Sequence, residues 1–539
     1  MKRRNFIKTT ALASIPLALN GIPVMASSII DSKSLSALAN AAANCDKVLV
    51  IIQMNGGNDG LNTIFPLDKW TNLSNARANI LMNQNQVLPL NNNSTTGFHP
   101  AMPELQNLYN NGKMMIVQGV SYPNPSYSHF RATDIWFSGA NSNENLTSGW
   151  IGRSLDKLYP NFPNGYPTTE MPDPLAIQIG STLPMSLQGP TINMGYTAPN
   201  PASLINVINQ ITDPAPNSDY GSELTFLRLM KDQSNVYRTA IQTAYNVPQT
   251  SPTVTYPTAN TLADQLRIVA KLINGGLKTP IYIVNHPKTH DTHADQVDAN
   301  NKVLGAQSVN LSLLSTAIGA FQQDLDNMGK ANKVTGMTFS EFGRRVKSNA
   351  SLGTDHGAAA PVLFFGAALN TSQSAVSGTA FPVAGMIGSS PNIPLNSTVN
   401  DQVPMQFQFK QIYASVMQDW LCMTESQTAE VLGGTFLKLP IFNNTMLSST
   451  NFEDENASFF KVYPNPVTNN LVNIQFSTDF TDFINVQIYS VQGTLIYNNN
   501  LKVNSGILTF EVSGFSSSGM YIMQIIYNQN KFYKSLLVN

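Results

Sequence analysis

The 539-residue sequence contains little cysteine and little charge. Its two cysteines, Cys45 and Cys422, are too few for a disulfide framework and leave either one bridge or two buried thiols. The 31 lysines and arginines nearly balance 32 aspartates and glutamates, which argues against a nucleic-acid-binding protein. Charged residues make up 12% of the chain, whereas asparagine, serine, threonine and glutamine are abundant. We interpret this neutral polar composition as that of a secreted protein.

Residues 1–26 predict an export signal. They have a basic start, a short and mildly apolar middle, and small residues near Ala26. This segment is too short and too weakly apolar for a stable membrane span. The pair Arg3-Arg4, followed by Asn-Phe-Ile-Lys, closely resembles a twin-arginine leader, which would take the folded protein through the twin-arginine translocase. A general secretory signal is the alternative.

The stretch from Val48 to Asn62 predicts the centre of the fold. Val48 to Ile52 are five consecutive apolar residues, as in a strand buried on both faces of a parallel sheet. Glycines at 56, 57 and 60 then permit a tight turn that presents Asp59 beyond the carboxyl end of the strand. Open parallel sheets bind their ligands at that end, although an ordinary loop with a solvated aspartate is also compatible.

Strand and helix patterns alternate through residues 46–445. Strands are expected at 48–52, 113–120, 174–180, 280–285, 334–339 and 361–365, and helices at 102–111, 130–137, 149–158, 261–274 and 311–328. This alternation predicts an α/β domain with a mainly parallel sheet. Short alternating strands replace it at 471–476, 484–489, 508–512, 520–527 and 532–538, which predicts a β-sandwich over 459–539. Linkers are expected at 27–45 and 446–458.

Histidines and carboxylates gather after the predicted strands. Four of the six histidines do so (His286, His290, His293 and His356), with Asp291, Asp295 and Asp355 beside them and with Asp59, His129 and Glu341 at the same rim. Mixed Asp and His ligands suit zinc, or manganese or iron where more oxygen ligands are present. A metal there would act on a phosphoryl or sulfuryl oxygen and help ionise a serine or a water. Taken singly, each residue is more often a structural histidine or a capping aspartate.

Seven sequence blocks, in order, resemble the domain-of-unknown-function family 1501, which is exported by the twin-arginine route and grouped with the alkaline phosphatase and sulfatase superfamily. The blocks are GGNDGLNT, HPAMPELQNLYNNGKM, NPSYSHFRATDIW, GWIGRSLD, DTHADQ, TFSEFGRR and GTDHGAAAPVLFFG, within about residues 46–440. The resemblance implies an alkaline-phosphatase-like three-layer αβα domain. It also implies metal ligands at the strand ends and a hydroxyl nucleophile after an early strand.

The resemblance also implies roles for single residues. Ser126, or less closely Ser128, occupies the place of the nucleophile. His129 is similar to the histidine that follows the nucleophile in cofactor-independent mutases. Arg344 or Arg345 would clamp the substrate anion, or would pair with a surface carboxylate instead.

Metal ligands are implied in the same way. Asp59 resembles the first-strand ligand, Asp291 and His293 the Asp/His pair of one metal, and His356 the late histidine. In residues 338–343 Glu341 replaces the usual aspartate and Phe342 replaces the usual histidine. Because phenylalanine binds no metal, and because Asp-Thr-His at 291–293 is shorter than the usual Asp-x-x-x-His, the number of ions stays open. An alternative alignment makes Asp355 and His356 the Asp-His pair but leaves no later histidine.

The C-terminal region resembles the type A sorting domain of the type IX secretion system. The matching motifs are Val-Tyr-Pro-Asn-Pro at 462–466, Val-Gln-Gly at 491–493, and Gly-Met-Tyr at 519–521, which leads into Lys-Ser-Leu-Leu-Val-Asn at 534–539. This resemblance implies export across the outer membrane of a Bacteroidetes-type bacterium. The protein would then be secreted or held at the cell surface, after passing through the periplasm.

The leading expectation is a secreted hydrolase of phosphate or sulfate esters that uses a serine nucleophile and a divalent metal. Zinc is the first choice of metal, with manganese, iron or calcium as alternatives. The second expectation, supported mainly by Phe342, is a non-catalytic surface or binding protein that keeps the fold. The substrate and the oligomeric state stay open at the level of sequence.

Overall fold

The computed structural model describes residues 17–19, 22–24, 45–204, 215–216, 218–371, 384–443, 460–468, 470–476, 481–490, 494–513, 515, 519–527 and 530–538. Within the expected export signal only β1 (Leu17–Leu19) and β2 (Ile22–Val24), an antiparallel pair, are described. The expected arginine pair Arg3-Arg4, nearly all of the linker at 27–45, the linker at 446–458 and the motif at 491–493 lie outside the described residues.

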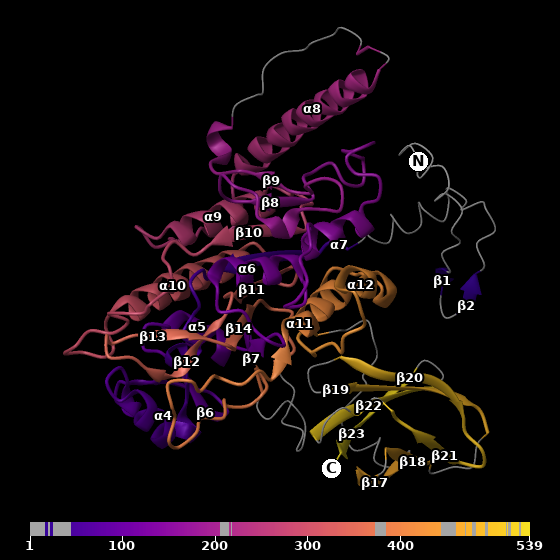
Figure 1. Cartoon of the computed structure of the whole chain (residues 1–539). Helices are drawn as coiled ribbons and strands as arrows, with labels where there is room; N and C mark the ends of the chain where they lie inside the picture. Colours follow the sequence, from indigo (N-terminus) through magenta and orange to yellow (C-terminus); the bar gives the residue numbers. More distant parts are fainter. Residues whose placement is uncertain are drawn as a thin grey trace.

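A nine-stranded sheet forms the centre of the larger unit (Figure 1). Its order is β15-β7-β14-β11-β3-β10-β8-β9, with β16 also paired to β7. The strands are β3 (Val48–Gln53), β7 (Met114–Ser121), β8 (Ala176–Gln178), β9 (Tyr196–Thr197), β10 (Ile281–Asn285), β11 (Val334–Phe339), β14 (Ala360–Phe365), β15 (Met386–Ile387) and β16 (Phe407–Gln408). Of these strands β14 alone runs antiparallel to its neighbours, on both sides. The mainly parallel sheet predicted from the sequence is therefore confirmed.

Helices cover both faces of this sheet and make a three-layer αβα unit. One face packs against α5 (Pro103–Asn110), α9 (Thr261–Asn274) and α10 (Ala306–Asn327), and the other against α6 (His129–Ser138), α7 (Trp150–Leu158), α11 (Phe409–Ser415) and α12 (Glu425–Leu432). Successive side chains of β3 alternate between the two layers, because side chains alternate along a strand: Leu49 and Ile51 enter one core, Val50 and Ile52 the other. Burial on both faces explains why this strand is apolar throughout.

Smaller elements complete the unit around the carboxyl ends of the strands. After β3 come α3 (Gly60–Thr63), α4 (Trp70–Arg77) and a small antiparallel sheet of β4 (Ile64–Pro66), β6 (Asn93–Phe98) and β5 (Leu88–Leu90). A hairpin of β12 (Gly343–Ser348) and β13 (Thr354–Gly357) lies between β11 and β14. The long helix α8 (Asp219–Tyr245) stands at the top of Figure 1. No helix among the described residues is long and apolar enough to cross a membrane.

A disulfide joins the two cysteines, which resolves the choice that the sequence left open. Cys45, just before β3, bonds to Cys422, just after the π-helical turn η5 (Val416–Trp420), across 377 positions of sequence. The indole of Trp420 donates to the carbonyl of Val48 at 3.0 Å. The disulfide therefore connects the start of β3 to the segment that follows η5.

The C-terminal unit is entirely β. Its strands are β17 (Phe460–Thr468), β18 (Leu471–Phe476), β19 (Phe483–Ser490), β20 (Leu495–Lys502), β21 (Ile507–Glu511), β22 (Gly519–Tyr527) and β23 (Asn530–Val538), in the order β20-β19-β22-β23-β17-β18-β21. Alternate residues such as Val472, Ile474, Val486 and Ile488 fill its core. The sequence indicated five of these strands. It did not indicate β17, which holds two prolines, or β20, which holds the run Asn498 to Asn500.

Candidate metal centre

Four loops bring titratable side chains together at one edge of the main sheet. His129 begins α6 after β7, Asp291 and His293 follow β10, Glu341 follows β11, and His356 lies on β13. Strands β10 and β11 pair with β3, and β7 pairs with β14. The loops after these strands therefore converge although their sequence positions are far apart. The structure thus brings together five of the residues that the sequence placed at this rim.

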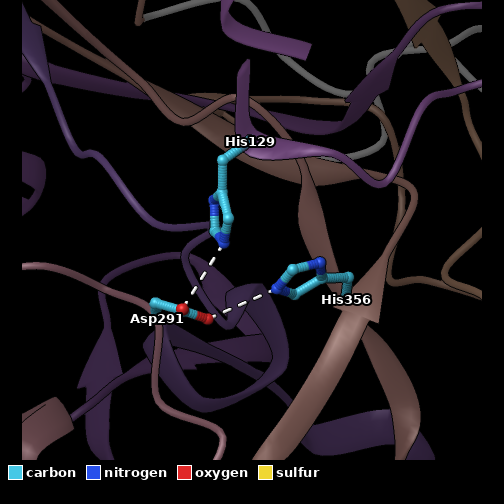
Figure 2. A group of neighbouring side chains, drawn as sticks. All are labelled: His129, Asp291 and His356. Carbon is cyan, nitrogen blue, oxygen red and sulfur yellow. Dashed lines mark hydrogen bonds and ion pairs between the residues drawn. The ribbon is translucent and has the colours of Figure 1, made fainter. Parts of the chain in front are cut away.

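Asp291 lies at the middle of the group (Figure 2). His129 and His356 approach its carboxylate from two sides, with His129 Nε2 at 3.4 Å from Oδ2 and His356 Nε2 at 3.3 Å from Oδ1. Ligand atoms of these three residues all lie within 4.8 Å of one another. A third imidazole is close, since His293 Nε2 lies 3.2 Å from Asp291 Oδ1 and 2.9 Å from His356 Nε2. His293 is therefore a fourth potential ligand beside these three residues.

The outer nitrogen of each imidazole faces an oxygen. His129 Nδ1 is 2.8 Å from Glu341 Oε1, His356 Nδ1 is 2.7 Å from the Tyr127 carbonyl, and His293 Nδ1 is 3.1 Å from Asp355 Oδ1. These oxygens can only accept hydrogen bonds, so a neutral imidazole that donates to them from Nδ1 would have its lone pair on Nε2. In that tautomer Nε2 of each ring, the nitrogen nearer to Asp291, would be free to bind a metal. Oxygen partners on the outer nitrogen are typical of histidines that bind a metal, and this donor set fits zinc.

The charges around the group favour the forms that bind cations. Burial alone would raise the pKa of Asp291, but the hydrogen bond and charge of Arg344, helped by His293 and His129, lower it overall. Burial lowers the pKa of His356 despite its hydrogen bond to the Tyr127 carbonyl, and the charge of Arg344 acts in the same direction. At neutral pH Asp291 is therefore ionised and His356 is neutral.

Arg344 does not lie free to clamp a substrate. Its side chain is fully buried and donates to the carbonyls of Gly57 at 2.7 Å and Thr354 at 2.8 Å, and to Asp291 Oδ1 at 2.7 Å. It also donates to the carbonyls of Gly56 and His290. The guanidinium instead connects the glycine turn after β3 to the loop that carries Asp291. The pairing with a surface carboxylate that the sequence allowed is observed, because Asp291 is exposed, whereas the anion clamp stays a prediction.

Arg345 is the more accessible of the two arginines. Its side chain is partly exposed, and it donates to the carbonyls of His356 at 3.3 Å and Val399 at 2.6 Å. The predicted anion contact therefore fits Arg345 better than Arg344.

Asp59 lies apart from this group, in contrast to the expectation that it would be a metal ligand. It is fully buried, and both carboxylate oxygens accept from Arg77, at 3.1 and 2.8 Å. Oδ2 also accepts from Gln296 Nε2 at 2.7 Å. A buried carboxylate needs a compensating charge. Arg77 on α4 supplies it, and that helix was not predicted.

The two candidate nucleophiles flank Tyr127. Ser126 is half-buried, and its Oγ accepts from the backbone N–H of Ser128 at 3.3 Å, while Ser128 is exposed at the start of α6. Among the described hydrogen bonds, neither serine hydroxyl contacts the side chain of His129, Asp291, His293 or His356. The residue between the two serines does contact one of them, because the Tyr127 carbonyl lies 2.7 Å from His356 Nδ1. The nucleophile assignment stays a prediction.

The remaining rim residues have other surroundings. His286 Nε2 lies 3.0 Å from the carbonyl of Asn310 and its Nδ1 accepts from the N–H of Lys288 at 3.3 Å, and His290 is wholly buried. Asp295 is exposed and outside the group. Phe342 stacks its ring against His129 and His356, with centroids 4.9 and 4.5 Å apart, and so forms an apolar wall of the site.

Two family models match the chain. Residues 239–427 match "Protein of unknown function (DUF1501)", and residues 461–539 match "Secretion system C-terminal sorting domain". Both families are those that the sequence motifs indicated, although the first match is shorter than the expected 46–440. The sorting domain marks a secreted or cell-surface protein of the type IX system. No curated protein is significantly similar to the chain.

Solved structures show a likeness at low identity. The sulfatase PsFucS1 from Pseudoalteromonas sp. is 10% identical, with a TM-score of 0.30 over 91% of this chain and 89% of that chain. An alkaline phosphatase superfamily protein from Vibrio parahaemolyticus is 10% identical, with a TM-score of 0.28 over 95% and 92%. A Bacteroides vulgatus DUF3244 protein with an immunoglobulin-like β-sandwich is 14% identical, with a TM-score of 0.13 over 16% and 90%.

Proposed function

From the matches of residues 239–427 to the DUF1501 family and of residues 461–539 to a secretion sorting domain, we propose that this protein is a secreted, metal-dependent hydrolase of phosphate or sulfate esters. The observation that supports it most is the convergence of the Nε2 atoms of His129, His293 and His356 on the Asp291 carboxylate. Three imidazoles and one carboxylate favour zinc over manganese, iron or calcium. The leader would be a twin-arginine signal, with the catalytic domain at 46–445 and the sorting domain at 459–539.

The residues around the group have distinct tasks in this proposal. A zinc ion held there would supply Lewis acidity toward an ester oxygen and favour ionisation of a nearby hydroxyl. Glu341, the Tyr127 carbonyl and Asp355 fix the ring orientations of His129, His356 and His293. Arg345, which is partly exposed, would contact the substrate anion. Ser126, or Ser128 in its place, would attack the ester.

Specific observations favour a second function, in which the domain is a non-catalytic binding or structural protein that keeps the fold. Arg344 is committed to Asp291 and to main-chain carbonyls, Asp59 is committed to Arg77, and Phe342 stands where the family motif has a histidine. Such a protein would still bind a metal but would hydrolyse no ester.

A hydrolysis assay on the full mature chain tests the first function. We expect slow release of nitrophenol from an aryl phosphate or an aryl sulfate, loss on chelation, and recovery with Zn²⁺. Since a ligand is removed, His356→Gln should lower the rate more than about 100-fold, by comparison with the roughly 10- to 100-fold effects of residues that only orient ligands. His286→Gln, which changes a buried histidine outside the group, is the matched control.

The serine assignment has its own outcomes in the same assay. Ser126→Ala should abolish turnover while leaving zinc content unchanged. Loss in Ser128→Ala alone would move the role to Ser128, and unchanged rates in both variants would exclude a serine nucleophile at this position. Stoichiometric zinc without hydrolysis of any ester would favour the binding protein.

A further inference from the structure

A buried glutamine lies between the two loops that carry most of the proposed ligands. Gln296 is fully buried, and its amide oxygen accepts from Thr292 Oγ1 at 3.0 Å and from Thr354 Oγ1 at 2.7 Å. Thr292 stands between Asp291 and His293, and Thr354 directly precedes Asp355 and His356. One amide oxygen therefore holds both ligand loops. The loops also touch directly, as the N–H of Thr354 donates to the carbonyl of Thr292 at 3.1 Å.

The orientation of this amide is set from its other side. Gln296 Nε2 donates to Asp59 Oδ2 at 2.7 Å, and a carboxylate can only accept, so the nitrogen must face Asp59. Asp59 is in turn held by Arg77, which also donates to the carbonyl of Val346 on β12 at 3.0 Å. With the nitrogen fixed toward Asp59, the amide oxygen must point at the two threonines.

We infer that Gln296 is a positioning residue for the proposed metal centre, and that Asp59 and Arg77 act through it. The inference rests on the proposed function. Asp59 then has a task other than binding metal, because its carboxylate orients the Gln296 amide. The amide in turn sets the distance between the 291–293 loop and the 354–356 segment. Loss of that clamp should loosen Asp291 and His293 relative to His356, and so weaken metal binding.

Exchanging the amide at position 296 and the carboxylate at position 59 tests the direction of the hydrogen bond between these two side chains. In Gln296→Glu two carboxylates would face each other, both acceptors and both buried, and the threonine contacts would be disturbed. In the double variant Asp59→Asn/Gln296→Glu the amide of residue 59 can donate to the carboxylate of residue 296, which restores the bond in the reverse direction and keeps the net charge of the wild type beside Arg77. Rescue by the pair distinguishes positioning from general destabilisation.

Titration of the full mature protein with Co²⁺, followed by its visible absorption and by competition with Zn²⁺, measures the effect. We expect Gln296→Glu to raise the dissociation constant roughly 10- to 100-fold and to change the band shape, and the double variant to recover most of the affinity. The matched control is Gln322→Glu on α10, a fully buried glutamine whose Nε2 donates to Asp326 at 3.2 Å. It should lose stability without losing affinity.

Thr354→Val keeps the side-chain shape and removes one of the two hydroxyl bonds, so it provides a second test should Gln296→Glu fail to fold. It should weaken Co²⁺ binding in the same direction. Equal affinity in Gln296→Glu and the wild type, or a double variant no tighter than the single one, would overturn the inference and leave the metal site standing. A wild-type protein that takes up neither Co²⁺ nor Zn²⁺ would overturn the proposed function together with this inference.

Discussion

Asp59 illustrates how the task of one residue depends on a partner distant in sequence. In the sequence it is a carboxylate at the carboxyl end of a central strand, where ligands bind. In the structure its charge is balanced by Arg77, 18 positions later, and both side chains are essentially inaccessible to solvent. Removing one member of such a pair leaves an uncompensated buried charge, which is costly.

Replacing Arg77 should therefore destabilise the protein strongly. Arg77→Met keeps the aliphatic bulk. It removes the guanidinium hydrogen bonds to the Asp59 carboxylate and to the carbonyls of Arg345 and Val346. We expect a loss of about 3–5 kcal/mol in the free energy of unfolding, measured by urea denaturation of the α/β unit.

Arg267→Met is the control for this substitution. Arg267 pairs with Asp264 at 2.9 Å, but both side chains are more than half exposed, so its loss should change stability by less than about 0.5 kcal/mol. A loss below about 1 kcal/mol in Arg77→Met would show that the buried pair does not support the fold as described.

At the scale of elements, the buried strands were the most predictable part of the fold. β3, β10 and β11 lie within one residue of their predicted ends, because a strand covered on both faces must be apolar along its whole length. Helix α9 was also predicted at its observed bounds, since its leucines and valine repeat on one face. These signals are local and need no knowledge of neighbours.

Elements held by distant contacts were missed. The hairpin β12–β13 has a polar sequence, and Arg344, buried within it, ties it to Gly57 and Asp291. Helix α8 has few buried positions along its 27 residues, so it shows no continuous apolar face. The antiparallel direction of β14 follows from the hairpin before it. The apolar residues of β14 themselves do not indicate the direction of the strand.

The candidate site divides in the same way. The types and approximate places of His129, Asp291, His293 and Glu341 could be read from the sequence, because they follow strands whose ends meet at one edge. His356 was expected there too, but it lies on β13 of the hairpin and not after a strand of the main sheet. The groups that orient these side chains could not be read from the sequence. The oxygen that holds His356 is the main-chain carbonyl of Tyr127, which any residue would supply, and Gln296 carries no motif of its own.

His99, at the end of β6, should make stability depend on pH. Burial lowers its pKa from 6.5 to about 4. Between these values the unfolded chain binds a proton that the folded chain does not, so stability falls as pH decreases from about 6.5 to 4, by about 3 kcal/mol in all from this residue. His99→Asn retains an acceptor for the N–H of Ala101, which His99 Nδ1 accepts at 3.1 Å, and does not titrate.

Urea denaturation at a series of pH values from 7 to 4.5 checks this prediction. The variant should show a shallower loss of stability than the wild type over that range, whatever its stability at pH 7. His286 and His290, whose pKa values are also lowered by burial, are present in both proteins and contribute equally. Parallel curves for the two proteins would exclude His99 as the titrating group.

At the scale of the whole molecule, the disulfide and the C-terminal unit both indicate a secreted or cell-surface protein. Disulfides persist in oxidising compartments, and the sorting domain marks a secreted or cell-surface protein. The bridge between Cys45 and Cys422 encloses nearly the whole α/β unit, and closing so long a loop stabilises a fold by several kcal/mol, roughly 2–5.

In the proposed function, His129, His293, His356 and Asp291 bind one metal ion together. Anomalous X-ray scattering at the zinc edge, from crystals of the zinc-loaded protein and of Asp291→Ala, tests whether they do. We expect one strong peak about 2.0–2.2 Å from the three Nε2 atoms and an Asp291 oxygen, and its loss in the variant. A zinc-loaded crystal with no peak among these residues, or with a peak that persists in Asp291→Ala, would show that these four residues do not form the zinc site.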